Sequence, residues 1–118
     1  SDNSGSIPQV TEETPAFRNI YISNIYSKNS ARAMFFNGLP EMKVQNVHIE
    51  NSVFISKQGA VIQQTNGVLM KNVKIDHSQG EIVELTNVDK ATFENVTDRR
   101  GVKHEIKQDG KNTEVVIR

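Results

Sequence analysis

Two pairs of glutamates invite a catalytic interpretation, because paired carboxylates can act as general acid and general base. Glu12 and Glu13 are adjacent in a polar segment that ends at Pro15, where a solvent-exposed pair is the favoured interpretation. Glu81 and Glu84 project from opposite faces if their segment is a strand, because side chains alternate along a strand. Neither pair is therefore expected to work as an acid and a base.

A second group, Lys74, Asp76 and His77, falls at an expected corner of the chain and includes residue types that bind metal ions. No third ligand accompanies Asp76 and His77, so a solvated turn is favoured over a metal site. The sequence has no cysteine, which excludes disulfides and thiolate metal centres. We therefore expect neither a metal nor another cofactor.

The composition describes one small domain without an obvious charged or membrane partner. The chain has 118 residues, with 14 basic and 14 acidic side chains and no run of lysine or arginine. This balance argues against nucleic acid or an anionic membrane as the main partner. No apolar stretch approaches the roughly 20 residues that a membrane helix needs. Twelve residues are asparagine, a high number that is the first clue to the fold.

An internal repeat explains the excess of asparagine. Four segments, the last one shorter, align without gaps on the pattern apolar-x-Asn-[Ile/Val]-x-Ile, and they begin at Phe17, Val44, Met70 and Phe93. The asparagines that anchor the alignment are Asn19, Asn46, Asn72 and Asn95. They are separated by 27, 26 and 23 residues, and a weaker set of asparagine-ending segments lies between them. The repeat is thus a unit of about 25 residues with at least two short strands.

Stacking of such units predicts an all-β fold, a parallel β-helix of about four coils over residues 17–98. One unit cannot bury its apolar face alone, whereas stacked units hydrogen-bond to one another as parallel strands do. Asparagine tolerates the left-handed backbone region, so the four anchoring asparagines are interpreted as structural corners. The expected columns are Phe17 over Val44, Met70 and Phe93, and Ile20 over Val47, Val73 and Val96.

Two other architectures have a similar spacing of short segments. A leucine-rich repeat needs a dense leucine pattern, but leucine occurs only at positions 39, 69 and 85. An antiparallel sandwich would place a hairpin turn about every 8–12 residues, and some Asn-Gly pairs could serve as such turns. The four in-phase repeats favour the β-helix over both alternatives.

The flanking segments do not follow the repeat. Residues 1–16 are rich in Ser, Gly, Pro and acidic residues and are expected to form an irregular lead-in or linker. Residues 99–118 contain Asp109-Gly110 between two β-prone runs, which predicts a C-terminal β-hairpin. A hairpin laid over the last coil would cover its exposed edge.

Three short stretches carry a resemblance to a known family. Residues 10–20 read Val-Thr-Glu-Glu-Thr-Pro-Ala-Phe-Arg-Asn-Ile, residues 38–42 read Gly-Leu-Pro-Glu-Met, and residues 46–51 read Asn-Val-His-Ile-Glu-Asn. These stretches resemble the C-terminal part of family 28 glycoside hydrolases, the polygalacturonase-like pectinases, and in particular their bacterial branch. The resemblance implies a right-handed parallel β-helix. For the whole enzyme it implies inverting hydrolysis of galacturonic-acid linkages in pectin and a secreted or periplasmic location.

The catalytic motifs of that family are not found in this sequence. Inverting hydrolysis needs a carboxylic acid and a carboxylate about 6.5–9.5 Å apart, and the family supplies them in Asn-Thr-Asp and Asp-Asp motifs, helped by Gly-His-Gly and Arg-x-Lys. Here no two aspartates are adjacent, no histidine precedes a glycine, and Arg100 and Lys103 are one residue too far apart. Because the family's motifs precede the matching stretch, we expect a non-catalytic C-terminal segment of a longer enzyme.

Positive and aromatic side chains could still contact an acidic sugar polymer, because cations bind carboxylates and aromatic rings stack on flat surfaces. The side chains considered are Tyr21, Tyr26, Lys28, Arg32, Phe35 and Phe36, although strand alternation is expected to place some of the rings in the core. The candidate substrate-binding residues chosen from them are Tyr26, Lys28, Arg32 and Phe36. The expected partner is pectic polysaccharide, bound by the parent enzyme of which this chain would be a part. The alternative function is that of a stand-alone carbohydrate-binding module. An open coil end would also expose apolar residues and an unpaired strand edge, which predicts self-association.

Overall fold

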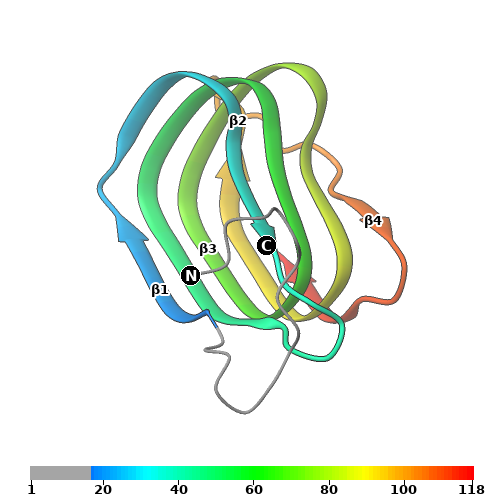
Figure 1. The fold of residues 1–118 in the computed structure, drawn as a ribbon. Helices are drawn as coiled ribbons and strands as arrows, with labels where there is room; N and C mark the ends of the chain where they lie inside the picture. Colours follow the sequence, from blue (N-terminus) through cyan, green and yellow to red (C-terminus); the bar gives the residue numbers. More distant parts are fainter. Residues whose placement is uncertain (1–16) are drawn as a thin grey trace, which may run out of the picture.

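The computed structural model describes residues 17–118, which wind through stacked coils (Figure 1). The strands are β1 (Arg18–Ser23), β2 (Tyr26–Asn37), β3 (Val44–Thr97), β4 (Lys107–Asp109) and β5 (Thr113–Ile117). No helix forms within this described range, so it contains none that is long and apolar enough to cross a membrane. The lead-in expected at residues 1–16 lies outside the described residues.

Parallel pairing joins each coil to the next. β3 is 54 residues long and passes through successive coils, so that its early part pairs with β1 and β2 and its late part with β4 and β5. The register places Ile20 opposite Val47, as predicted, at one end of the stack and Ala91 opposite Val115 at the other. The chain is therefore an all-β parallel solenoid of about four turns, which confirms the predicted fold class.

The core fills the inside of the coils. Side chains alternate along each strand, so apolar residues of successive coils meet on the inner side. The side chains that are less than 2% exposed include Val47, Ile49, Ile62, Met70, Val73, Ile75, Leu85, Val88 and Phe93. Burial of this continuous apolar column is the main stabilising contribution, because stabilisation grows with the apolar area removed from water.

The first coil is more open than the coils that follow. Within residues 17–118 it has a neighbouring coil on one side only, so Ile20 and Ile22 are only partly buried. Phe17 is 75% exposed and Tyr21 is 63% exposed on the same coil. The self-association proposed for this end stays a prediction.

Corners of the coil are built from residues with a left-handed backbone, and two of these corners carry the asparagines that anchor the repeat. At the first corner the residues with positive φ are Asn19, Asn46, Gly67, Lys90 and Glu114. Five residues further along each coil, the second corner has Asn24, Asn51, Asn72 and Asn95, with φ between 53° and 57°. Asparagine suits these positions because its short polar side chain can form local hydrogen bonds. The four anchoring asparagines of the repeat are thus divided between the two corners.

Side-chain amides link the asparagines of successive coils. At the first corner, Asn46 Nδ2 donates to Asn19 Oδ1 at 3.2 Å. At the second corner, Asn72 Nδ2 donates to Asn51 Oδ1 at 3.3 Å, and Asn95 Nδ2 donates to Asn72 Oδ1 at 2.9 Å. These bonds tie neighbouring coils together at the points where the chain changes direction.

This ladder corrects one of the predicted columns. The repeat alignment placed Asn72 over Asn46, but Asn72 lies beside Asn51, and Gly67 lies beside Asn46. The step between these coils is therefore 21 residues. The alignment failed because both corners carry asparagine, so it matched the first corner of one coil to the second corner of the next. The apolar columns predicted across this junction shift with it.

The C-terminal segment forms a further turn of the same path. At the corner between β4 and β5, Asn87 Oδ1 accepts a hydrogen bond from the Lys111 N–H at 2.8 Å, and Gly110 has a φ of 68°. Asn112 Oδ1 accepts one from the Val88 N–H at 2.8 Å. The two strands expected after residue 98 are present and cover the last coil. Each pairs in parallel with β3, which differs from the mutual pairing of an antiparallel hairpin.

Substitution of Asn72 tests the contribution of the ladder. Asn72→Ala removes the bonds to Asn51 and Asn95 and places alanine in the left-handed region, so we expect the free energy of unfolding to fall by about 2 kcal/mol. Asn72→Gly keeps the backbone conformation accessible and should cost about 1 kcal/mol. Denaturant unfolding measures both values, with Asn66→Ala as control because Asn66 is exposed. Equal stabilities of Asn72→Ala and Asn66→Ala would contradict this role.

Candidate functional site

Three of the four predicted substrate-binding residues lie on the outside of β2. Tyr26 is 58% exposed, and Lys28 is exposed. Arg32 Nε donates to Gln58 Oε1 at 3.0 Å, and the guanidinium carbon of Arg32 lies 5.1 Å from the centroid of the Phe35 ring. One cation therefore stands beside one exposed aromatic ring on the first coil.

The fourth predicted residue, Phe36, is placed differently from the expectation. Its ring packs against the core, opposite the buried Ile62, whereas Phe35 is 50% exposed. The reason is the alternation of side chains along β2, which turns neighbouring residues to opposite faces. Phe35, and not Phe36, is thus the ring that a ligand could reach beside Arg32.

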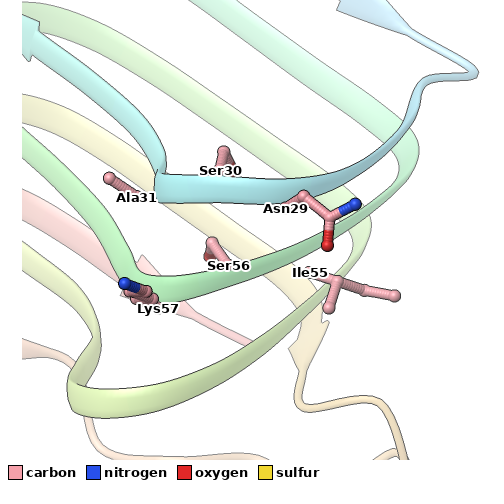
Figure 2. Close-up of a pocket in the computed structure, with 6 residues that line it drawn as sticks. All are labelled: Asn29, Ser30, Ala31, Ile55, Ser56 and Lys57. Carbon is pink, nitrogen blue, oxygen red and sulfur yellow. The ribbon is translucent and has the colours of Figure 1, made fainter.

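A hollow of about 460 Å³ lies between β2 and β3 (Figure 2). It is lined by Asn29, Ser30, Ala31, Ile55, Ser56 and Lys57. The register of β2 is irregular between Lys28 and Ser30, and Ser30 Oγ is buried without a hydrogen-bond partner in the described part of the chain. None of the four predicted residues lines this hollow, and Arg32 lines an adjacent one with Lys57 and Gln58.

Of the glutamates that first invited a catalytic interpretation, only Glu81 and Glu84 lie among the described residues. Glu84 Oε1 lies 4.0 Å from Lys107 Nζ, and Glu81 is exposed. Glu12 and Glu13 lie outside the described residues. The structure therefore gives no acid and base couple at residues 81–84.

Among residues 17–118, Asp89 forms the shortest ion pair with a lysine. Lys43 Nζ lies 2.8 Å from Asp89 Oδ2, and the Thr113 hydroxyl donates to Asp89 Oδ1 at 2.8 Å. The hydrogen bond from Lys43 is the main cause that lowers the pKa of Asp89, followed by the bond from Thr113. This carboxylate stays ionised and links the loop before β3 to the start of β5.

A cluster that the sequence analysis did not predict lies where β3 ends. Asp98 closes a tight turn there, because its Oδ1 accepts hydrogen bonds from the N–H groups of Arg100 and Val102, both at 2.9 Å. Its Oδ2 lies 2.8 Å from His104 Nε2. Gly101, with a φ of 87°, completes the turn. A single carboxylate thus fixes residues 98–104.

This turn lies against Asp76 and His77 of the preceding coil. The His77 and His104 rings meet edge to face, with their centroids 5.7 Å apart. Arg99 Nη1 lies 3.9 Å from Asp76 Oδ2. The hollow that results has a volume of about 450 Å³ and is lined by Asp76, His77, Asp98, Arg99, Arg100 and His104. We call these six residues the His–Arg cluster.

The solvated turn expected at residues 74–77 is therefore only part of the arrangement. Lys74 is exposed, but Asp76 and His77 are half-buried and contribute to the cluster. Among residues 17–118, no three histidine or acidic side chains are grouped so that they could hold a metal ion. The Asp-Arg-Arg-Gly run at 98–101 is a turn signal in the sequence. The predicted step from Asn72 to Asn95 is correct and puts this run level with His77, but the repeat ends at Asp98 and does not indicate that the following turn packs against that coil.

The electrostatics of the cluster centre on Asp98. The hydrogen bond from His104 is the largest cause that lowers the pKa of Asp98 to about 2, and the N–H groups of Val102 and Arg100 add to it. Asp98 therefore carries its negative charge at neutral pH and cannot act as a general acid there. Nδ1 of His77 is buried and has no hydrogen-bond partner among the described residues.

Comparisons with known proteins give no family assignment. No protein-family model, no curated protein and no solved structure matches this chain. The functional interpretation therefore depends on the residues and the geometry described above.

Protonation of Asp98 should loosen the turn at residues 98–104. Because its pKa is lowered from 3.8 to about 2 in the folded state, Asp98 contributes stability that is present above pH 3.8 and is lost as the pH falls through about 2. Asp98→Asn keeps the shape but not the charge. The variant should be less stable than the wild type at neutral pH, and this difference should shrink as the pH falls from about 4 to about 2.

Urea unfolding midpoints at neutral pH, near pH 4 and near pH 2 measure this difference. Asp109→Asn is the control, because the 3.9 Å contact of Asp109 with Lys107 is solvent-exposed and worth little. A difference between wild type and Asp98→Asn that is constant over this pH range would contradict the role given to Asp98.

Proposed function

We propose that this chain is a non-catalytic C-terminal β-helix segment of a polygalacturonase-like family 28 glycoside hydrolase. Its role is to extend and cap the coil stack that carries the active site. The observation that supports the proposal is the uninterrupted parallel stack, with β4 and β5 laid against the last coil. A fold of this type agrees with the β-helix implied by the family resemblance of residues 10–20, 38–42 and 46–51.

The two carboxylates with a lowered pKa, Asp98 and Asp89, fit a non-catalytic role. Inverting hydrolysis needs one protonated acid and one carboxylate that is free to activate water. Asp98 has a lowered pKa, and both of its oxygens hold the turn. Asp89 is held by Lys43 and Thr113. Both groups stabilise the fold as anions, which is a different task from proton transfer to a glycosidic oxygen.

The partner and the location form part of the same proposal. The parent enzyme acts on pectic polysaccharide. The segment contacts that polymer only as part of the parent enzyme. Secretion or export to the periplasm brings the enzyme to its substrate. Both statements are carried over from the family resemblance.

A reducing-sugar assay on polygalacturonate tests the proposal. The purified chain should release reducing ends no faster than a heat-denatured sample of the same chain. Asp98→Asn and Asp89→Asn are the matched variants, because they remove the two carboxylates with lowered pKa. Turnover by the chain that is lost in either variant would contradict the proposal.

A stand-alone carbohydrate-binding module is the second candidate function. The observation that favours it is the guanidinium of Arg32 beside the exposed ring of Phe35 on β2. A guanidinium binds a carboxylate through two parallel hydrogen bonds, and an exposed ring offers a flat apolar surface to a sugar. Lys28 adds a second cation on the same strand.

Calorimetric titration with oligogalacturonides tests this second candidate. Loss of a charge-assisted hydrogen bond in Arg32→Gln should weaken binding about tenfold. Arg118→Gln is the control, because Arg118 lies at the other end of the chain, 3.7 Å from Glu94. No heat at millimolar ligand, or equal affinities of the two variants, would exclude binding at the Arg32 surface.

A further inference from the structure

The His–Arg cluster brings hydrogen-bond donors around one hollow at the end of the coil stack. The volume of about 450 Å³ falls within the range of about 300–1,000 Å³ that is usual for ligand pockets. Its residues come from two segments, the corner at Asp76 and His77 and the turn at 98–104. Because the turn is held by the hydrogen bonds of Asp98, the hollow has a fixed wall rather than an open loop.

The two carboxylates of the cluster differ in how fully they are engaged. Asp98 Oδ1 accepts hydrogen bonds from the N–H groups of Arg100 and Val102, and Asp98 Oδ2 is hydrogen-bonded to His104 Nε2. Asp76 is the other carboxylate, and its only ion pair in the described part of the chain is the 3.9 Å contact with Arg99. Neither carboxylate is therefore in close contact with the guanidinium of Arg100.

The donors, in contrast, are left available. Arg100 forms no ion pair among residues 17–118, and the side chain of Arg99 is 57% exposed at its long contact with Asp76. His77 Nδ1 is buried and unpartnered over the same range. Buried polar atoms are nearly always hydrogen-bonded, so an orphaned ring nitrogen marks a position that a ligand or water completes. Arg99 and Arg100 thus offer unused donors to the hollow, and His77, which also lines it, has an unpartnered Nδ1 that is a donor in the tautomer protonated there.

The chemistry of these donors selects the ligand. Two guanidinium groups disfavour a cation, whereas they match the oxygens of a carboxylate or phosphate in a forked geometry. With neutral histidines the formal charges of the two arginines and two aspartates cancel, so the orientation of unused donors, rather than net charge, favours an anion. The negative charge of Asp76 opposes binding, and Arg99 offsets part of it.

We infer that the His–Arg cluster binds an oxyanion group, the carboxylate or phosphate of a ligand, through Arg100 and Arg99, with His77 donating from Nδ1. Asp98 is a positioning residue, because it holds the turn that presents both arginines. This inference does not depend on the proposed hydrolase assignment, since it uses only the groups that line the hollow. Carboxylate and phosphate share the chemistry, and the probes below distinguish them.

Titration of the full, isotope-labelled chain tests the site by NMR chemical shifts. The probes are inorganic phosphate, galacturonate, and neutral galactose as the ligand without an anionic group. Phosphate or galacturonate should shift the signals of residues 99–104 and of His77, and galactose should not. Arg100→Gln should weaken binding about tenfold, the loss expected for a charge-assisted hydrogen bond. His77→Phe keeps an aromatic ring beside His104 and should weaken binding several-fold.

Arg118→Gln is the matched control and should bind as the wild type does. Arg100→Lys keeps the charge without the fork, so its affinity should fall between those of wild type and Arg100→Gln. Binding by phosphate alone or galacturonate alone identifies the ligand group and supports the site. Equal affinities of Arg100→Gln and Arg118→Gln, shifts confined to other residues, or equal responses to galactose and galacturonate overturn it. A lack of anion binding would not affect the prediction that the chain has no hydrolytic turnover. The binding proposal and the proposed hydrolase assignment are therefore tested independently.

Discussion

The structure depends on a chain that changes direction at the same place in every coil. Parallel strands stay paired around a corner only if the corner residues of neighbouring coils share one conformation. At the second corner this is the left-handed conformation, found at Asn24, Asn51, Asn72 and Asn95. For most residues other than glycine, the left-handed conformation costs about 1–2 kcal/mol. Asparagine lowers this cost, and its side chain also bonds to the next coil at distances of 2.9 and 3.3 Å. The coil register, and with it the core, follows from these corners.

The sequence contained enough information to predict the fold but not the register at every junction. Alternating Val and Ile between asparagines predicted stacked parallel coils, and the pairing of Ile20 with Val47 is as expected. The step from Asn51 to Asn72 was not predictable from the pattern, because both corners carry the same residue type five positions apart. Steps of 21 and of 26 residues both match asparagine to asparagine. A gapless alignment does not decide between the two steps.

The candidate site was only partly foreseen, because it depends on the buried face of β2 and on the turn that follows the repeat. Arg32 could be predicted as an exposed cation, but the choice of Phe36 over Phe35 required knowing which face of β2 is buried. The His–Arg cluster forms because the turn after β3 lies against the preceding coil, which brings together His77 and His104 from segments 27 residues apart. Asn72 and Asn95, four and three residues before Asp76 and Asp98, thus set the register of a site to which they contribute no side chain.

The central claim is that the second-corner asparagines set the register between coils. Nuclear Overhauser contacts between the side-chain amide protons of Asn72 and its neighbours test it most directly, because such contacts are seen only over about one coil spacing, roughly 5 Å. The account predicts contacts from Asn72 to Asn51 and to Asn95, and none to Asn46. Contacts between Asn72 and Asn46 would contradict it, because they would restore the 26-residue step of the sequence alignment.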